Sequence, residues 1–293
     1  MYFHLVPFRF CQIYIFVPER EFVISLEPIS AEEFSHFRRT IYDYAGIALT
    51  SEKKTMVASR LAKRLLHYGL HSYGQYYQLL NTGQHPDEFQ LMVNILTTNE
   101  TYFFREPKHF DFLREQIIKH WHGDNFRLWS AASSTGEESY SIGMLLDEGL
   151  GMRKLEVIGS DVNTEVLEIA RKGVYLMDRL DNMEQHYLDK YCLKGVRSQE
   201  GYFRVDEKIR KHISFAQINL KAPLPKSLGQ FDVIFLRNVL IYFDTETKQD
   251  IVQRVVSTLK PGGYFFISHS ETLHSIKTEL SMVIPSIYRK PCK

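Results

Sequence analysis

The sequence is short of the residues that build metal clusters and cross-linked scaffolds. It has 293 residues and three cysteines, Cys11, Cys192 and Cys292, which lie far apart and form no CxxC pair. This spacing excludes a cysteine zinc site and a disulfide framework, and it favours a reducing, cytoplasmic location. Because no His/Cys cluster or Ser-His-Asp pattern stands out either, we predict no metal.

An excess of charge of one sign is also missing. The chain has 36 basic and 35 acidic residues, for a net charge of +1. Such a protein lacks the overall field that holds nucleic acid, so we predict no nucleic-acid partner and expect any charged partner to meet a local patch. A hydrophobic share of 44% is enough for a sizeable core, and the length favours two domains of unequal size.

Long apolar runs are absent as well. Residues 1–17 are apolar and aromatic, but Arg9 and Gln12 interrupt them, and no stretch reaches the ~18–20 residues that a membrane-spanning helix needs. There is no basic leader and no small-residue cleavage site, so we predict neither a secretory signal nor stable membrane insertion. We assign no role to residues 1–25: a flexible or spuriously translated extension is favoured over a weak membrane or partner anchor.

Residues 26–98 predict a small helical domain. Ser30 is a suitable cap before two acidic residues, and apolar side chains then recur at three- and four-residue spacing until Gly46. Further helices are expected from Ser51, over Tyr73–Leu80 and over Pro86–Leu96, and no strand pattern interrupts them.

Strand and helix patterns alternate after about residue 125. The expected strands, each followed by a turn or a helix, are 127–130, 157–160, 213–216, 231–236 and 264–268, with a short last one near 286–288. This alternation predicts crossover units and a parallel sheet covered on both faces. An irregular stretch of about 174–212 predicts a small β insertion, and Pro261-Gly262-Gly263 predicts a turn.

The first of these strands ends in a turn of small residues, 131–136, before Glu137 and Glu138. In an open α/β sheet, a nucleotide-like ligand binds at such a turn. The GxGxxG pattern is missing, which disfavours an NAD-dependent oxidoreductase. The acidic pair would repel a pyrophosphate but would suit the ammonium group of an adenosyl-linked amino acid. The alternative is that both acids only stabilise the helix start.

Polar residues also follow the later strands. Asp161 stands where a carboxylate accepts hydrogen bonds from ribose hydroxyls, with helix capping as the alternative. Asn238 and Tyr242 follow an apolar strand, and Asn219 closes another in the way an adenine contact would. Residues 97–106 concentrate aromatic and polar groups between the predicted domains, which favours a site there over a merely packed joint.

Five segments in this order resemble the CheR-type chemotaxis receptor (protein-glutamate) O-methyltransferases: NETYFFRE, WSAASSTGEESYS, SDVNTEVLEIARKGVY, FDVIFLRNVLIYFD and LKPGGYFFISHSETL. The resemblance covers residues from about 30 to 290. It implies an α/β class I methyltransferase with a Rossmann-like doubly wound sheet at 99–293, a helical N-terminal domain at 26–98 and a small β subdomain inserted at about 174–212.

The resemblance implies methyl transfer from S-adenosylmethionine to glutamate carboxylates of methyl-accepting chemotaxis receptors, with S-adenosylhomocysteine as the second product. It places Arg105 and Tyr242 near the transferred methyl group as catalytic residues. The implied cofactor contacts are Asn99, Thr101, Arg105, one of Glu137 and Glu138 (with Glu138 favoured), Asp161, Asn219, Leu220, Asn238 and Val239.

A receptor would also need a docking surface. The basic residues of the second helix predict one for an acidic receptor helix, with a solvated charged face as the alternative: Lys53, Lys54, Arg60, Lys63 and Arg64. A receptor tail at the β insertion is a further option, carried by Gly195, Gly201 and Arg204. Lys194 stands there in place of an expected arginine, whose fork suits a carboxylate better.

Two other functions use the same features. A methyltransferase acting on RNA or a small molecule would share the sheet and Asp161, but the near-neutral charge gives it no support. A non-catalytic adaptor would keep the fold as a binding module, and cofactor binding without turnover would favour it. Ser139, where relatives usually have proline, and Ser133 are small departures from the family pattern.

Overall fold

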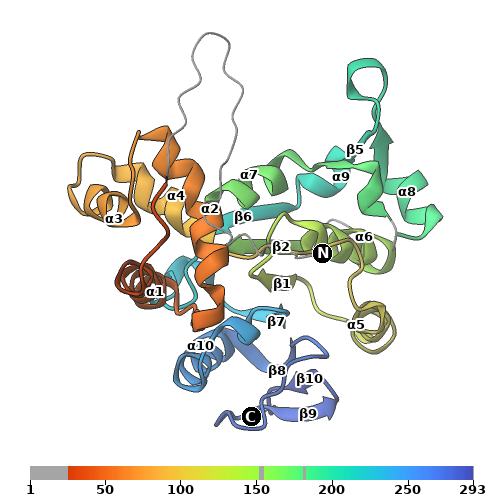
Figure 1. Ribbon diagram of the computed structural model, residues 1–293. Helices are drawn as coiled ribbons and strands as arrows, with labels where there is room; N and C mark the ends of the chain where they lie inside the picture. Colours follow the sequence, from red (N-terminus) through yellow and green to blue (C-terminus); the bar gives the residue numbers. More distant parts are fainter. Residues whose placement is uncertain (1–25, 152–154, 181–182, 293) are drawn as a thin grey trace, which may run out of the picture. The chain divides into compact units, whose positions relative to one another are not determined.

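The computed structural model describes residues 26–151, 155–180 and 183–292, so the expectations for residues 1–25 lie outside the described residues (Figure 1). The chain falls into two compact units. Unit 1 comprises the residues up to Thr40 together with Leu49–Leu96, and unit 2 comprises Ile41–Ala48 and the residues from Thr97 onward. The boundary expected near residue 98 stays a prediction, and this grouping adds residues 41–48 to the second unit.

Unit 1 is helical. Its helices are α1 (Ala31–Ala45, whose last turn groups with unit 2), α2 (Lys54–His67), α3 (Tyr73–Asn81) and α4 (Pro86–Leu96). The Ser30 hydroxyl accepts a hydrogen bond from the Glu33 N–H, and the Glu33 carboxylate accepts one from the Ser30 N–H, so a capping box starts α1. Ser72 and Gln75 form the same motif at α3.

Unit 2 contains a seven-stranded sheet in the order β6-β2-β1-β7-β8-β10-β9. The strands are β1 (Phe126–Ala131), β2 (Leu155–Asp161), β6 (Ile213–Gln217), β7 (Phe231–Phe235), β8 (Leu259–Phe266), β9 (Ser281–Ile284) and β10 (Ile287–Arg289). The first five in the order are parallel, and β10 and β9 are antiparallel additions. The predicted class I methyltransferase fold is confirmed.

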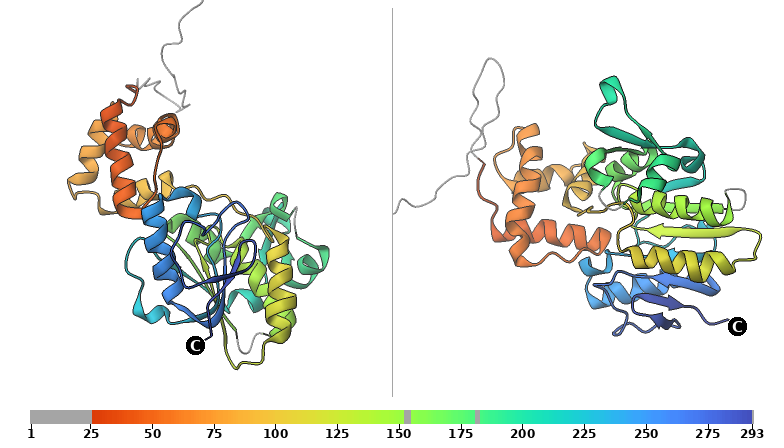
Figure 2. Two further views of the ribbon diagram at one scale, coloured as in Figure 1. Left: turned by 90° about the horizontal axis from the view of Figure 1, so that it is seen from below. Right: turned by 90° about the vertical axis from the view of Figure 1, so that its right-hand side faces the viewer.

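The central strands are buried on both faces because helices cover each side of the sheet (Figure 2). Leu128 and Phe235 pack in one apolar cluster with residues of α5 (Pro107–Phe112) and α6 (Glu137–Leu150). Trp129 and Ile234, their neighbours along the strands, pack in a second cluster with α10 (Thr245–Ser257). The near-continuous apolar runs of the sequence follow from this double burial.

The β insertion forms a separate small sheet in the order β3-β5-β4. Its strands are β3 (Val174–Leu176), β4 (Cys192–Lys194) and β5 (Tyr202–Val205), and the neighbouring helices are α7 (Thr164–Lys172), α8 (Gln185–Tyr191) and α9 (Glu207–Arg210). Aromatic side chains attach this sheet to the rest of unit 2: Phe103 lies 5.1 Å from Tyr175 and 5.6 Å from Phe203 between ring centroids.

Some expectations were wrong in detail. Pro261-Gly262-Gly263 lies inside β8 instead of in a turn, and the pairing of β7 with β8 shifts register there. A Cβ on Gly263 would stand 2.9 Å from the Asp232 carbonyl oxygen, so the irregular strand depends on a glycine. Helix α5 and edge strand β9 were not anticipated. No helix in the described part of the chain is both long enough and apolar enough to cross a membrane.

Candidate functional site at the carboxyl edge of the sheet

The ends of three parallel strands bring the predicted site residues of unit 2 to one edge of the sheet. Ala131 at the end of β1 pairs with Ser160 of β2, and Ser130 pairs with Phe235 of β7. The residues that follow these strands therefore start from the same edge. In doubly wound sheets the ligand crevice lies at this carboxyl edge.

The turn after β1 has an unusual backbone. Ala132, Ser134 and Gly136 all have positive φ angles, of 64°, 50° and 95°. A Cβ on Gly136 would stand 2.8 Å from the Cβ of Ala170, so the turn packs tightly against α7. The hydroxyl of Ser133 is buried and finds no hydrogen-bond partner among the described residues. A buried hydroxyl in a turn of small residues is suited to a polar ligand at this place.

Asp161 ties the ends of β1 and β2 together. Its carboxylate accepts hydrogen bonds from the Ser134 N–H, at 2.9 Å, and from the Asn163 N–H, at 3.0 Å. Burial raises the pKa of this carboxyl group. Asn163, and not Asp161, caps α7 by accepting from the N–H groups of Glu165 and Val166. The capping alternative for Asp161 was therefore wrong. The Val162 N–H also bonds to this carboxylate, so part of its acceptor capacity remains for another donor.

The two glutamates that begin α6 point to different neighbours. Glu137 accepts from the Thr135 hydroxyl at 2.6 Å and lies 3.5 Å from the Arg179 guanidinium near the β insertion. Glu138 accepts from the Ser130 hydroxyl at 2.7 Å and from Arg237 at 2.9 Å. Glu138 is thus held at the ends of β1 and β7.

Residues 97–106 are joined to this edge by hydrogen bonds. The Asn99 carbonyl accepts from the Ser134 hydroxyl at 2.8 Å, and the Thr101 carbonyl accepts from Arg179 at 3.2 Å. The Arg105 guanidinium donates to the Glu100 carbonyl at 2.8 Å and lies over the Tyr102 ring. The backbone carbonyl of Arg105 accepts a hydrogen bond from the Arg237 guanidinium at 2.5 Å. The segment that contains three of the predicted site residues is therefore part of the same edge.

The segment after β7 is held mainly by its backbone. Asn238 has a φ of 57°, and its N–H donates to Glu271 at 3.1 Å. Val239 and Tyr242 pack against the second apolar cluster, and Tyr242 lies in the short helix η8 (Leu240–Tyr242). Its carbonyl accepts from the Ala48 N–H.

Asn219 and Leu220, which follow β6, already use their polar atoms in hydrogen bonds within unit 2. The Asn219 amide donates to the Tyr44 carbonyl at 2.6 Å, and its oxygen accepts from the Lys221 N–H. Leu220 is buried, and its carbonyl accepts from Arg254. The structure does not add these two residues to the hydrogen-bonded group around Glu138 and Asn238.

A charged network that the sequence analysis did not assign lies behind this edge. Arg237 is only 1% exposed in its side chain and bridges Glu138, at 2.9 Å, and Glu106, at 3.1 Å. Both Arg237 and Glu106 stand inside segments quoted for the resemblance. The available signal was a charged residue directly after a buried apolar strand, which must find an ionic partner.

Three potential metal ligands, Glu106, His109 and His269, also lie within 4.8 Å of one another. The Ser286 hydroxyl lies between the two rings, 2.7 Å from His109 Nε2 and 3.1 Å from His269 Nδ1. Burial and the nearby Arg237 lower the pKa of His109 to about 3, so its ring is neutral near pH 7. The Ser286 hydroxyl thus accounts for Nε2 of His109, whereas its buried Nδ1 has no hydrogen-bond partner among the described residues and lies 3.3 Å from Glu106 Oε2.

The basic residues of unit 1 do not form one uniform surface. Arg64 forks onto Glu88, with distances of 2.7 and 2.6 Å, and Arg60 donates to the Ile95 and Leu96 carbonyls at the end of α4. Lys53 and Lys63 are exposed, and Lys54 is partly buried. Arg64 therefore has an internal ion-pair partner.

The residues singled out in the β insertion shape its turns. The Gly195 N–H donates to the Tyr202 carbonyl, and a Cβ on Gly195 would stand 1.9 Å from the Gln199 carbonyl oxygen. Gly201 has a φ of 87°, and Arg204 is exposed on the middle strand. Both glycines are explained by backbone geometry.

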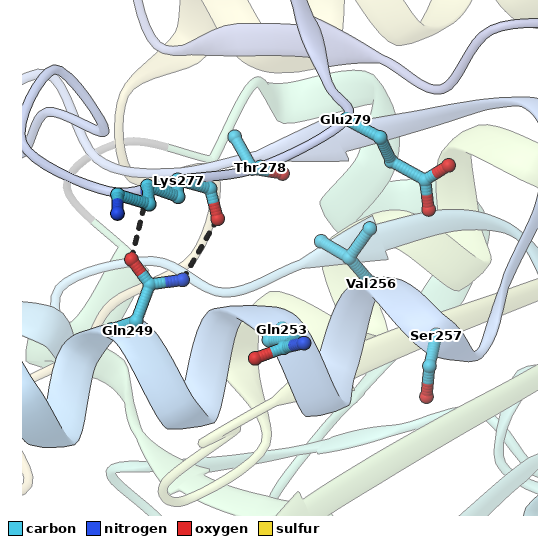
Figure 3. Close-up of a pocket in the computed structure, with 7 residues that line it drawn as sticks. All are labelled: Gln249, Gln253, Val256, Ser257, Lys277, Thr278 and Glu279. Atoms are coloured by element: carbon cyan, nitrogen blue, oxygen red, sulfur yellow. Dashed lines mark hydrogen bonds between the residues drawn. The ribbon is translucent and has the colours of Figure 1, made fainter.

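A surface groove of about 740 Å³ lies elsewhere in unit 2, between α10 and the segment before β9 (Figure 3). Gln249 bridges its two sides by reciprocal hydrogen bonds with the backbone of Lys277, each 2.8 Å long. None of the predicted site residues lines this groove.

Two known protein-domain families match most of the chain. Residues 32–97 match the all-alpha domain of CheR methyltransferases, and residues 99–288 match their SAM-binding domain. The chain belongs to the CheR methyltransferase family. The suspected family is thus confirmed, and this member is an S-adenosylmethionine-dependent methyltransferase of chemotaxis.

Relatives cover most of this CheR-family chain. It is 42% identical to the chemotaxis protein methyltransferase of Salmonella typhimurium over 259 residues, which are 87% of this chain and 89% of that protein. The Escherichia coli protein of the same name is also 42% identical, over 87% of this chain and 90% of its own length. Chemotaxis protein methyltransferase 2 of Pseudomonas aeruginosa is 42% identical, over 82% of this chain and 86% of its own.

The hydrogen-bond acceptors at the sheet edge fit S-adenosylmethionine. The cofactor offers ribose hydroxyls and an ammonium group as donors, and the edge provides carboxylates at Asp161 and Glu138 to accept from them. The left-handed turn of small residues after β1 allows close approach of a ligand to the backbone. The Ser133 hydroxyl supplies a further buried polar atom.

Proposed function

We propose that this CheR-family enzyme methylates glutamate side chains of methyl-accepting chemotaxis receptors and so produces glutamate methyl esters. The observation that supports this most strongly is the 42% identity to a chemotaxis protein methyltransferase over 87% of the chain. The sheet edge adds chemical support, because it combines acceptors for the cofactor with the guanidinium of Arg105, which suits an anionic substrate.

The geometry of the edge supports a set of proposed cofactor contacts. Asp161 accepts a ribose hydroxyl with its remaining acceptor capacity, and Glu138 accepts from the ammonium group. Asn99, Thr101 and Val239 contribute from the neighbouring segments. Glu137, Asn219 and Leu220, whose polar atoms already bond locally, support the walls of the site through their backbone positions.

The methyl transfer itself needs orientation more than proton exchange. S-adenosylmethionine, when bound, would supply an electrophilic methyl group on a sulfonium, whose sulfur would keep the S–C bond electrons as a carboxylate oxygen took the methyl group. The receptor carboxylate needs no general base, because with an unperturbed pKa of about 4.3 it is already ionised near neutral pH. Arg105 and Tyr242 orient the acceptor, and alignment supplies most of the acceleration.

A labelling experiment tests this proposal. The purified protein is incubated with methyl-labelled S-adenosylmethionine and membranes that contain chemotaxis receptors from the same organism. Label on a receptor-sized band that mild base releases as methanol is the expected result, since carboxyl methyl esters are base-labile. Cofactor binding without any receptor label would favour a non-catalytic adaptor, and label on RNA or a small molecule would favour the other methyltransferase classes.

Replacing Tyr242 with phenylalanine tests its orienting role. We expect turnover to fall about tenfold with little change in cofactor affinity, because one positioning hydrogen bond is lost while the ring still packs. Single-turnover methylation and calorimetric titration with S-adenosylmethionine measure the two quantities. A Tyr242→Phe enzyme that binds cofactor poorly but turns over normally when saturated would contradict the assignment.

Charge reversal on α2 tests the receptor-docking surface. Because Arg64 pairs with Glu88 and Arg60 caps α4, we use the exposed Lys53 and Lys63. Lys53→Glu combined with Lys63→Glu is expected to raise the receptor KM several-fold. The effect is limited because each exposed charge pair contributes little to binding. Cofactor affinity is the internal control, and Lys226→Glu is the matched exposed variant. A receptor KM equal to that of the Lys226 variant would remove α2 from the proposed dock.

The receptor tail is a second partner, proposed for the β insertion. The outer strands β3 and β4 leave open edges, and Leu193 and Val196 are exposed beside β4. An extended peptide can add to such an edge through main-chain hydrogen bonds. Lys194 brings a single ammonium group to the edge in place of an arginine fork, which favours weak capture.

A further inference from the structure

Asn238 is held on its backbone side by the carboxylate of Glu271. The Asn238 N–H donates to Glu271 Oε2 at 3.1 Å, and the Ile241 N–H donates to Oε1 at 3.3 Å. The Ser268 N–H also donates to Oε2, at 2.8 Å. These bonds hold the left-handed backbone of Asn238 and thus the direction in which its side chain leaves the strand.

The side-chain amide of Asn238 is held by two acceptors. Its Nδ2 donates to Ser268 Oγ at 2.8 Å and lies 3.4 Å from Glu106 Oε1. The Ser268 hydroxyl itself donates to Glu106 Oε1 at 2.7 Å, so its own oxygen is left to accept from Nδ2. A flipped amide would place Oδ1 against the Glu106 carboxylate, which has no hydrogen to donate. The network therefore directs Nδ2 toward Ser268 and Glu106 and leaves Oδ1 on the opposite side of the amide.

Glu106 keeps this acceptor character because it is ionised. Burial alone would raise the pKa of Glu106, but Arg237 and hydrogen bonds from Ser268 and the His269 N–H lower it to about 2. The pKa thus lies below the unfolded value of about 4.3. The stability that Glu106 contributes is present above that value and is lost as the pH falls toward 2.

We propose that Glu106 is a positioning residue that orients the amide of Asn238, so that Oδ1 accepts a hydrogen bond from the ammonium group of S-adenosylmethionine. Among the described residues none donates to Oδ1, so it is the unused group of this amide. The ammonium is the favoured donor because Glu106 and Glu138 present two carboxyl groups here against one guanidinium, that of Arg237. Burial raises the pKa of Glu138, and a cation beside it would lower that pKa again. The inference rests on the proposed placement of the cofactor at this edge.

Calorimetric titration of the full-length protein tests this role. The ligands are S-adenosylmethionine, S-adenosylhomocysteine and 5′-methylthioadenosine, which lacks both the ammonium and the carboxylate of the amino-acid part. Glu106→Gln should weaken binding of the first two about tenfold, a loss typical of one hydrogen bond to a charged group, and leave methylthioadenosine unchanged. In an Asn238→Ala background, the same substitution should have no further effect on binding. Glu115→Gln, at an exposed carboxylate, is the matched control.

Three outcomes would overturn the proposal: unchanged binding in Glu106→Gln, equal losses for all three ligands, or an undiminished effect in the Asn238→Ala background. Should Glu106→Gln fail to fold, Ser268→Ala removes the other acceptor and must show the same selectivity for ligands with an ammonium group. In a protein that folds, Glu106→Gln should also reduce the loss of stability between about pH 4.3 and 2. These measurements need no receptor, so failure to methylate a receptor would reject the proposed substrate and leave this inference standing.

Discussion

Replacing Arg64 with alanine is expected to destabilise unit 1 by about 3–5 kcal/mol, because it leaves a buried carboxylate without its ionic partner. The side chain of Glu88 is 1% exposed and accepts both arms of the Arg64 guanidinium, at 2.7 and 2.6 Å. The Tyr76 and Tyr68 hydroxyls donate to the same carboxylate, at 2.8 and 3.0 Å. These bonds and the ion pair lower the pKa of Glu88 against the effect of burial. Denaturant unfolding followed by circular dichroism measures the change.

Two further variants make this result specific. Lys63→Ala removes a neighbouring exposed cation of α2 and should leave the unfolding midpoint almost unchanged. The pair Arg64→Met with Glu88→Gln removes both charges and should recover part of the loss. An Arg64→Ala protein as stable as the Lys63 variant would show that the buried pair does not stabilise the unit. Loss of receptor methylation in Arg64 variants therefore has to be corrected for unfolding before it is read as loss of docking.

Replacing Asp161 with alanine is expected to weaken binding of S-adenosylmethionine by about a hundredfold, since a charge-assisted hydrogen bond to ribose is lost. The carboxylate already accepts from the N–H groups of Ser134 and Asn163. Its removal also frees the turn after β1 from the end of β2, which adds to the loss. Equilibrium titration with the cofactor gives the affinity directly.

The controls for Asp161 separate binding from folding. Asp161→Asn keeps the size of the side chain and should still bind the cofactor weakly, while the melting temperature reports any loosening of the turn. Asp250→Ala, at an exposed aspartate of α10, should bind like the unsubstituted protein. Affinity unchanged in Asp161→Ala would remove this residue from the proposed ribose contact.

Local patterns in the sequence predicted most of the secondary structure. The helix expected over Pro86–Leu96 has those bounds in the structure, because Pro86 can begin a helix and an apolar face continues from it. The Pro261-Gly262-Gly263 turn was wrong for a reason of tertiary structure. The segment bulges between the pairs that Leu259 and Tyr264 make with β7, and Gly262 and Gly263 exchange backbone hydrogen bonds with Lys290 after β10. Turn-forming residues describe what a chain can do alone, and pairing in a sheet overrides them.

The network behind the site depends on contacts that no local pattern contains. Glu106 and Ser268 are 162 positions apart, and Arg237 is 99 positions from Glu138. Likewise, helical spacing places Arg64 on a face of α2 but does not say whether solvent or α4 covers that face. The resemblance named the cofactor contacts, whereas the residues that orient them became visible only through their hydrogen bonds.

The separation between Glu106 and Ser268 in the sequence determines when the site can form during translation. At about 5–20 residues per second, a ribosome needs roughly 8–32 s to add the 162 residues between them. During that interval Glu106 has neither Ser268 nor the His269 N–H, and Arg237 is also missing for most of it. The nascent chain therefore cannot complete the network around Asn238, and this enzyme should acquire its binding site only near the end of translation.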